Sequence, residues 1–453
     1  MHTDESINAY LTGELLDGKE YHYDPRDRHG PALLAVAEPL AKLLGAKNFV
    51  ELTETQLRLS TVLTGTATIL LFGAAVEVFG FIACLIAALL FAFAPLPVYY
   101  SRYFIHESLF VAATLGLILS GWRALLKKSL MSAALAGFCA ALMLACKETA
   151  VIHFFALGVA ALIGWRLLPM VQMPKSKVIV IAGGVFLTTI VLLFTWFGQN
   201  WSGLADLFRA VPHLASRAGG EGHEKPFWYY ARLLADGWSG AVLLGLATLG
   251  IFRARQAGPR LLLVVYALLI AVIYSAIPYK TPWLALNFWL PLALLAGFAV
   301  EWLWRATSKP FPRALILIGL TTVGFLMAHD TRKWVFQIPA DEKNPYAYAH
   351  TSEDLLSLPK RLEELTQQKN ISNPRITVIA ADAWPLPWYL RKFSQAGFLQ
   401  PGQAMWDADF FITTSDLSDE LAERLKHLRP EFFGWRPGVI LILWTPAPAK
   451  SEP

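Results

Sequence analysis

Ten apolar segments constrain this chain more than any other feature of its sequence. Each holds about 20 residues, the length that an α-helix needs to cross the hydrocarbon core of a bilayer. With 55% hydrophobic and 16% charged residues, a chain of 453 residues has too little polar surface to form a soluble globule. The sequence therefore predicts a polytopic α-helical membrane protein with spans at residues 59–78, 81–98, 108–126, 130–146, 149–168, 178–197, 236–252, 261–277, 283–304 and 313–328.

Lysine and arginine residues gather in every second connection between these segments, as the positive-inside rule requires of cytoplasmic loops. Residues 1–58, the remaining connections and the tail would then lie on the external side. No segment ahead of the acidic N-terminal arm could start its translocation. We therefore expect a first spanning helix upstream of Met1, missing from this sequence through a mis-assigned start codon.

The sequence divides into three parts. Residues 1–58 form an external arm, in which "ALLAVAEPLAKLLGA" is too short and too polar to span and is expected to lie on the membrane surface. Residues 59–328 form the multi-spanning domain. Residues 329–453 alternate helical periodicity with short apolar runs such as "RITVIAA", "DFFITTS" and "VILILWT", which predicts a small soluble external α/β domain. Neither a G-x-G-x-x-G sequence nor a Walker loop supports nucleotide binding.

An acidic pair, Asp4 and Glu5, opens the chain within "HTDES". Acidic residues are common at the start of a helix, where they cap it. External carboxylates at a bilayer entrance are also retained for chemistry, and we favour that interpretation. Asp4 is the better candidate, with Glu5 orienting it.

Three further turns on the expected external side carry charge. In "SRYFIHES", Arg102, His106 and Glu107 form either a structural pair at the membrane surface or part of an active site. In "CKETA", Lys147 and Glu148 interrupt almost forty apolar residues. They form either a hairpin turn with a self-neutralising pair of charges or a site that binds a lipid phosphate. "IPYKTPW" places a second lysine, Lys280, at similar depth, which suggests a site for an anionic headgroup.

Several of these stretches together resemble a known family: "HTDES", "YDPRDRHGP", "SRYFIHES", "KETA", "IPYKTPWLALN", "NPYAYAHTS" and "DAWPLPWYL". The chain resembles a prokaryotic membrane family, labelled flippase-activity-associated, that is related to the protein O-mannosyltransferases and the lipid A aminoarabinose transferases. These belong to the GT-C superfamily of multi-spanning glycosyltransferases. The resemblance implies transfer of a sugar from a polyprenyl-phosphate donor to a glycan, lipid or protein acceptor, on the external face of the inner (plasma) membrane.

The resemblance also implies roles for the charged turns. Asp4 matches the position of the general base, and Lys147 matches a basic residue near the donor phosphate. Many relatives carry aspartate where this chain has Glu107. The expected catalytic residues are Asp4, Glu5 and Glu107. The expected phosphate-binding residues are Arg102, Lys147 and Lys280, of which Arg102 and Lys280 are placed by their depth and charge. The candidate substrate contacts are His29, His106, Glu148 and Tyr279.

Two other functions compete with a transferase. A non-catalytic accessory protein for translocation of lipid-linked sugars would use the same turns as structural pairs. An ion-coupled transporter would place charges in the middle of its spans, whereas these charges gather at helix ends. No cofactor is established by the sequence. A divalent metal stays open, since His223 in "RAGGEGHEKPFWYY" has glutamate neighbours but no fixed ligand spacing. No nucleic-acid partner is expected.

Overall fold

The computed structural model describes residues 1–26, 29–167, 174–220, 222–254, 258–403, 407–416 and 419–446. The chain forms two compact units. The helical unit contains Gly18–Leu44 and Thr55–Pro339, and the C-terminal unit contains Met1–Asp17, Gly45–Glu54 and the chain from Ala340 onward. The expected arm at residues 1–58 therefore contributes to both units.

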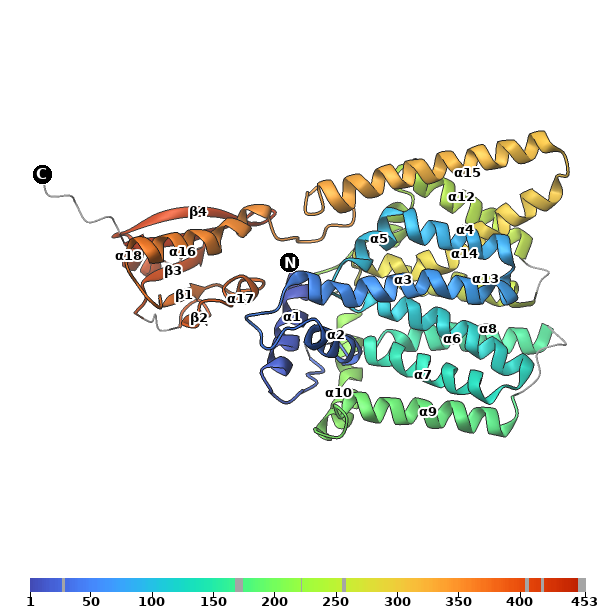
Figure 1. Ribbon diagram of the computed structural model, residues 1–453, viewed down its shortest axis with the longest axis horizontal. Coiled ribbons are helices and arrows are strands. Elements are labelled where there is room, and N and C mark those ends of the chain that lie inside the picture. The colour runs from blue at the N-terminus through green and yellow to red at the C-terminus, as the bar shows by residue number, and fades with distance from the viewer. Residues whose placement is uncertain are drawn as a thin grey trace, which may run out of the picture. The chain divides into compact units, whose positions relative to one another are not determined.

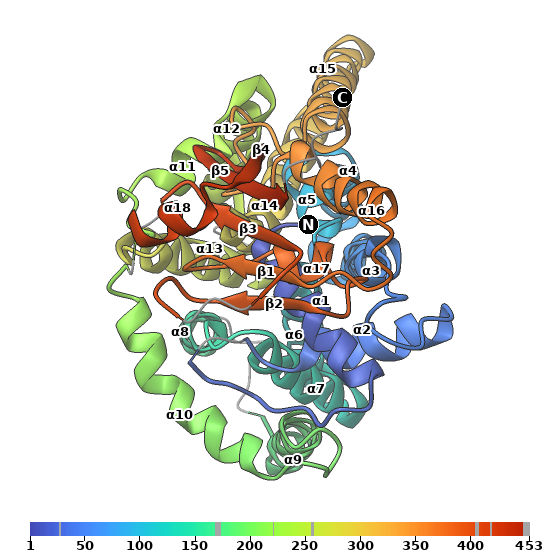
Figure 2. The same cartoon turned by 90° about the vertical axis from the view of Figure 1, so that its left-hand side faces the viewer.

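Long apolar helices run alongside one another in the helical unit (Figure 1). Its helices are α2 (Ala32–Leu43), α3 (Glu54–Phe79), α4 (Phe81–Phe93), α5 (Pro95–Ser101), α6 (Glu107–Lys127), α7 (Leu130–Cys146), α8 (Ala150–Leu167), α9 (Ser176–Phe194), α10 (Ser202–Arg217), α11 (Tyr229–Leu234), α12 (Gly237–Ala254), α13 (Gly258–Ala276), η1 (Pro282–Leu284), α14 (Ala285–Ala306), α15 (Pro310–Thr331) and η2 (Arg332–Gln337). In both views, α9 and α15 lie at opposite edges of this unit (Figures 1 and 2).

Eight helices in the described part of the chain are long and apolar enough to cross a membrane. The bent pair α4 and α5, with 63° between the two helices, adds a ninth crossing if it counts as one span. The predicted span at 130–146 is α7, an apolar helix of 17 residues. Each predicted segment thus corresponds to a helix or a helix pair, and the expected polytopic helical fold is confirmed.

Burial separates a central helix from peripheral ones. Within their apolar windows, 94% of the span that contains α14 is buried inside the protein, against 6% of the span that contains α15. Apolar side chains such as Phe311 and Phe325 on α15 are each 72% exposed. An apolar helix that is exposed on this scale is favourable only in lipid, so α15 is a lipid-facing helix and α14 forms the core.

A five-stranded sheet forms the centre of the C-terminal unit, with the strand order β2-β1-β3-β5-β4. β1 pairs in parallel with β2 and β3, whereas β5 is antiparallel to β3 and β4. This unit confirms the small C-terminal α/β fold. Its elements are α1 (Thr3–Leu16), η3 (Glu353–Ser357), α16 (Leu358–Gln368), β1 (Ile376–Ile379), α17 (Leu386–Tyr389), β2 (Ala396–Leu399), β3 (Phe410–Thr414), α18 (Asp419–Leu425), β4 (Leu428–Arg436) and β5 (Val439–Pro446).

Helix α1 packs against α17 within the C-terminal unit. The Tyr10 ring meets the rings of Phe49 and Trp384 edge-on, at centroid distances of 5.5 and 5.7 Å. Phe49 in turn lies 6.0 Å from the ring of Trp388, which is 2% exposed. These aromatic contacts attach the acidic N-terminal helix to a part of the chain that follows it by more than three hundred residues.

Candidate functional site

A buried ion pair joins the start of α6 to the turn between α7 and α8 in the helical unit. Lys147 Nζ contacts Glu107 Oε1, and the two residues are 6% and 1% exposed. Glu107 is the first residue of α6, where the helix dipole favours a negative charge. In the described structure, its second oxygen, Oε2, is buried and accepts no hydrogen bond. A carboxylate oxygen without a donor at such depth is costly, so Glu107 Oε2 is a candidate contact for a ligand.

Glu148, the next residue in the turn, binds two side chains from the segment before α2. The hydroxyl of Tyr23 donates to Oε1 over 2.8 Å, and Nδ1 of His29 lies 3.4 Å from Oε2. Burial raises the pKa of Glu148, but the hydrogen bonds from His29 and Tyr23 outweigh it and lower the pKa to about 2. Glu148 is therefore a fixed negative charge at neutral pH.

His106 completes this group of residues. Its Nε2 lies 3.1 Å from the carbonyl oxygen of Gly30, and a carbonyl only accepts, so Nε2 carries the hydrogen. Burial lowers the pKa of His106 well below its usual range, hence the imidazole is neutral at pH 7. The His29 ring meets the His106 ring edge-on at 5.4 Å. We call Tyr23, His29, His106, Glu107, Lys147 and Glu148 the Glu107–Lys147 centre.

The Glu107–Lys147 centre is most accessible at one side. The side chains of His29 and Glu148 are 38% and 15% exposed, whereas those of Lys147 and Glu107 are 7% and 2% exposed. A polar ligand would meet His29 and Glu148 first and the ion pair last. Of the predicted site residues, the structure brings together Glu107, Lys147, His29, His106 and Glu148.

The other two predicted phosphate-binding cations contact backbone carbonyls. Arg102 donates from Nη1 to the carbonyl of Val335 over 2.9 Å, and its guanidinium lies 4.3 Å above the Phe336 ring. Lys280 Nζ donates to the carbonyls of Ile277 and of Lys225, the latter over 3.1 Å. Desolvation lowers the pKa of Lys280. These contacts attach each cation to the protein backbone.

Tyr279 lies in a short ladder between two loops. It forms an antiparallel bridge with Glu224, and its ring lies 4.8 Å from that of His223. The amide of Lys280 donates to the carbonyl of His223 over 3.1 Å. In the described part of the chain, no group of three or more His, Cys, Asp or Glu side chains is arranged to hold a metal ion.

Asp4 and Glu5 lie in the other unit, in the first turn of α1. The Glu5 carboxylate accepts from the backbone amide of His2 over 3.1 Å, while Nδ1 of His2 accepts from the amide of Asp4 over 3.1 Å. This reciprocal pattern is a capping box. Glu5 is 1% exposed, whereas Asp4 is half-buried, so Asp4 is the more accessible carboxylate of the pair.

A buried histidine in α8 was not predicted as part of any site. His153 Nδ1 lies 2.8 Å from the hydroxyl of Tyr266, and its Nε2 lies 3.0 Å from the hydroxyl of Tyr274. A histidine inside an apolar span was the signal in the sequence, because ionisable residues at membrane depth are rarely without a partner.

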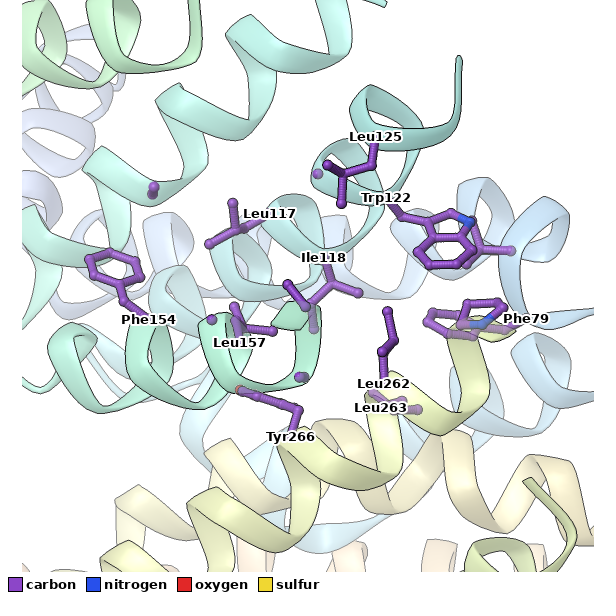
Figure 3. A pocket seen from close by; sticks show the side chains of 17 residues that line it. Phe79, Leu117, Ile118, Trp122, Leu125, Phe154, Leu157, Leu262, Leu263 and Tyr266 are labelled. Carbon is purple, nitrogen blue, oxygen red and sulfur yellow. The ribbon is translucent and has the colours of Figure 1, made fainter. Parts of the chain in front are cut away.

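An apolar cavity of about 380 Å³ lies among α3, α6, α7, α8 and α13. Phe154 and Leu157 face Leu117 and Ile118 across it, and Tyr266 lies at its edge (Figure 3). Leu117 is ten residues along α6 from Glu107, roughly 15 Å at the rise of an α-helix. The cavity therefore lies away from the Glu107–Lys147 centre and contains none of the predicted site residues.

Comparison with known proteins places these features in context. Residues 30–196 match the model of the family described as dolichyl-phosphate-mannose-protein mannosyltransferase. No curated protein sequence matches the chain. Residues 30–196 include every member of the Glu107–Lys147 centre except Tyr23 and His29.

Two solved structures share the fold. The structure of ArnT from Cupriavidus metallidurans bound to undecaprenyl phosphate has 14% identical residues and a TM-score of 0.66, with 97% of this chain and 93% of that chain covered. The archaeal oligosaccharyltransferase AglB from Archaeoglobus fulgidus, in complex with an inhibitory peptide and a dolichol-phosphate, has 12% identity and a TM-score of 0.56, with 96% and 70% covered. At these identities the two structures show the fold, and together with the family match they confirm that the chain resembles this class of multi-spanning glycosyltransferases.

Proposed function

We propose that this protein is a membrane glycosyltransferase that moves a sugar from a polyprenyl-phosphate donor to an acceptor at the external face of the plasma membrane. The observation that carries the proposal is the buried pair of Glu107 and Lys147, with one carboxylate oxygen unsatisfied, in a multi-spanning helical unit. The fold is shared with ArnT bound to undecaprenyl phosphate and with AglB in complex with a dolichol-phosphate, which supports a lipid-phosphate donor.

Lys147 is the residue that we assign to the donor phosphate. An ammonium group has three N–H donors, and Glu107 is the partner of Lys147 in the described structure. Glu107 compensates the charge of the buried lysine and orients its side chain, which leaves further N–H donors for phosphate oxygens. Arg102 and Lys280 already donate to backbone carbonyls, so we assign them to support of the surrounding loops.

Departure of the lipid phosphate is the step that Lys147 assists. The bond between sugar C1 and the phosphate oxygen breaks, and its electron pair leaves with the phosphate. The negative charge that develops is stabilised most by a cation in a poorly solvated site, which describes Lys147 at 6% exposure. Glu148 and His29, at the more exposed side, are assigned to hydroxyl groups of the sugar, with neutral His106 behind them.

Asp4 is the residue that we assign to the acceptor. Its carboxylate takes the proton of the acceptor hydroxyl as that oxygen attacks C1 from the face opposite the phosphate, so the configuration at C1 inverts. The half-exposed position of Asp4 suits this role, whereas Glu5 is occupied by the helix cap. The external location rests on the distribution of lysine and arginine among the connections.

Release of the lipid phosphate tests the function directly. The purified full chain in lipid nanodiscs is incubated with a panel of undecaprenyl-phosphate-linked hexoses and pentoses and with cell-envelope extract as the acceptor source. We expect release of undecaprenyl phosphate from at least one donor, loss of at least 100-fold in rate for Asp4→Asn, and an unchanged rate for Glu14→Gln, an acidic residue later in the same helix. An accessory protein would release no lipid phosphate from any donor.

A further inference from the structure

Residues 344–352 of the C-terminal unit lie beside the start of α1, where the hydroxyl of Thr351 donates to the carbonyl of Met1 over 2.5 Å. That segment begins with a compact turn, in which the amide of Tyr346 donates to Oδ1 of Asn344 over 3.0 Å. It ends where the amide of Ser352 donates to the carbonyl of Trp435 in β4 over 2.8 Å. Both ends are thus fixed, one by its own turn and one by the sheet.

The backbone of Tyr348, in the middle of this segment, interacts with two histidines. Its amide donates to Nδ1 of His350 over 3.0 Å. It also interacts with the ring of His2. Because Nδ1 of His2 accepts from the amide of Asp4, the hydrogen of the neutral imidazole is on Nε2.

The two imidazoles also contact each other. The ring centroids of His2 and His350 are 5.1 Å apart, with their planes inclined by 43°. His2 is 4% exposed, so its ring has little freedom to change rotamer. The charged groups that face this pair are Glu5, Arg436 and the amino group of Met1. A continuous set of contacts therefore runs from His350 through Tyr348 and His2 to the amide of Asp4.

We propose that His350 is a positioning residue, which fixes Asp4 for its reaction through Tyr348 and the His2 cap. This inference rests on the proposed role of Asp4 as general base. A general base must lie within hydrogen-bond reach of the acceptor hydroxyl, and a shift of the base by about 1 Å costs on the order of 100-fold in rate. Asp4 lies in the first turn of α1, and a helix end frays unless its cap is held.

Two substitutions of similar size separate the hydrogen bond from the volume of the side chain. In His350→Asn, the side-chain oxygen takes the place of Nδ1 and accepts from the amide of Tyr348. In His350→Gln, the acceptor lies one methylene further out and misses it. We expect His350→Gln to lower kcat about 100-fold with KM for the lipid donor unchanged, and His350→Asn to retain the rate within about threefold. His427→Ala, at an exposed histidine of the same unit, should have no effect.

A double substitution tests whether the effect passes through Asp4. If His350 acts by positioning Asp4, then His350→Gln slows no reaction that already lacks the carboxylate, and Asp4→Asn/His350→Gln has the rate of Asp4→Asn alone. Equal slowing in both backgrounds, or wild-type activity of His350→Gln, overturns the positioning role. If Asp4→Asn itself keeps the full rate, then the proposed function of Asp4 fails first, which distinguishes the two failures.

Discussion

The hydroxyl of Tyr23 donates a hydrogen bond to the carboxylate of Glu148 over 2.8 Å, across 125 residues of sequence. This contact joins the segment before α2 to the turn after α7, and both of its residues belong to the Glu107–Lys147 centre. In this centre, the surroundings set the charge state of two side chains. Glu148 is ionised because it accepts hydrogen bonds, and His106 is neutral because it is buried.

Loss of the Tyr23 hydroxyl should change the acid stability of the helical unit. The pKa of Glu148 is about 2 in the folded protein against 4.5 for the free group, so its contribution to stability is present above pH 4.5 and is lost as the pH falls from 4.5 to about 2. Tyr23→Phe removes one donor and raises this pKa. The acid-induced fall of the thermal midpoint in detergent should therefore begin near the same pH in Tyr23→Phe as in the wild type, but should be smaller and end at a higher pH.

Tyr21→Phe is the matched control for that prediction. Tyr21 belongs to the same segment and packs its ring at 4.8 Å from Trp196. In the described structure, the hydrogen bonds that Glu148 receives from side chains come from Tyr23 and His29. If both variants show the same acid profile as the wild type, the hydroxyl of Tyr23 does not determine the ionisation of Glu148.

Removal of one partner of the Glu107–Lys147 pair should destabilise the helical unit. Lys147→Met leaves Glu107 as a buried charge without compensation, which costs about 3–5 kcal/mol of unfolding free energy. Glu107→Gln combined with Lys147→Met removes both charges and should recover most of that loss, while binding of undecaprenyl phosphate remains weak. Thermal unfolding and lipid-binding titrations separate the two effects.

An exposed pair at the other end of α6 provides the comparison. Lys127 and Glu77 contact each other, and their side chains are 59% and 49% exposed. Lys127→Met should leave the thermal midpoint unchanged, because exposed ion pairs are screened by water. If Lys127→Met lowered the thermal midpoint as much as Lys147→Met, burial would not explain the larger cost expected for the Glu107–Lys147 pair.

Much of the fold could be predicted because its signals are local. Spans depend on runs of apolar residues, and β1, β3 and β5 are largely buried strands rich in β-branched and aromatic residues. Strand β2, with the sequence AGFL, is only partly buried, and β4 lies at the edge of the sheet and contains Pro430, so neither carries such a pattern.

The membership of α1 in the C-terminal unit could not be predicted from the sequence. It depends on tertiary contacts between segments far apart in the sequence, such as that of the Tyr10 ring with the ring of Trp384 at 5.7 Å. For the same reason, the sequence shows that Lys147 and Glu148 are unusual between two apolar segments, but it does not show their partners. Lys147 pairs with Glu107, and Glu148 accepts from Tyr23. Charge and depth alone did not distinguish Lys147, which pairs with a carboxylate, from Lys280, which contacts carbonyls.

Truncation of Trp388 should loosen the attachment of α1. Trp388 is 2% exposed, contacts the Phe49 ring and carries the guanidinium of Arg391 at 3.8 Å from its ring. Trp388→Ala removes a large buried ring and should cost about 3–5 kcal/mol. Limited proteolysis after Asp17 should then become faster. Phe432→Ala, at a side chain that is 65% exposed in the same unit, should leave the cleavage rate unchanged.

Acidification should weaken the cap of α1. Burial lowers the pKa of His2 from 6.5 to about 4, so between these values the unfolded chain binds more protons than the folded one, and stability falls as the pH drops from 6.5 to 4. His2→Asn keeps a good capping side chain without a titrating group. Amide hydrogen exchange in the first turn of α1 should rise between pH 6.5 and 4 in the wild type and, after correction for intrinsic rates, stay level in His2→Asn.

Two glycines in neighbouring spans should respond oppositely to the same substitution. At Gly158 of α8, a Cβ atom would meet no other atom within 4 Å, because the position borders the apolar cavity. At Gly137 of α7, a Cβ would collide with the backbone of Ala182 in α9. Gly158→Ala should therefore raise stability by up to about 1 kcal/mol through helix propensity, whereas Gly137→Ala should lower it, since two helices must separate. Equal thermal midpoints for the two variants would mean that α7 and α9 do not pack at the close distance described, because helix propensity alone gives the same gain at both positions.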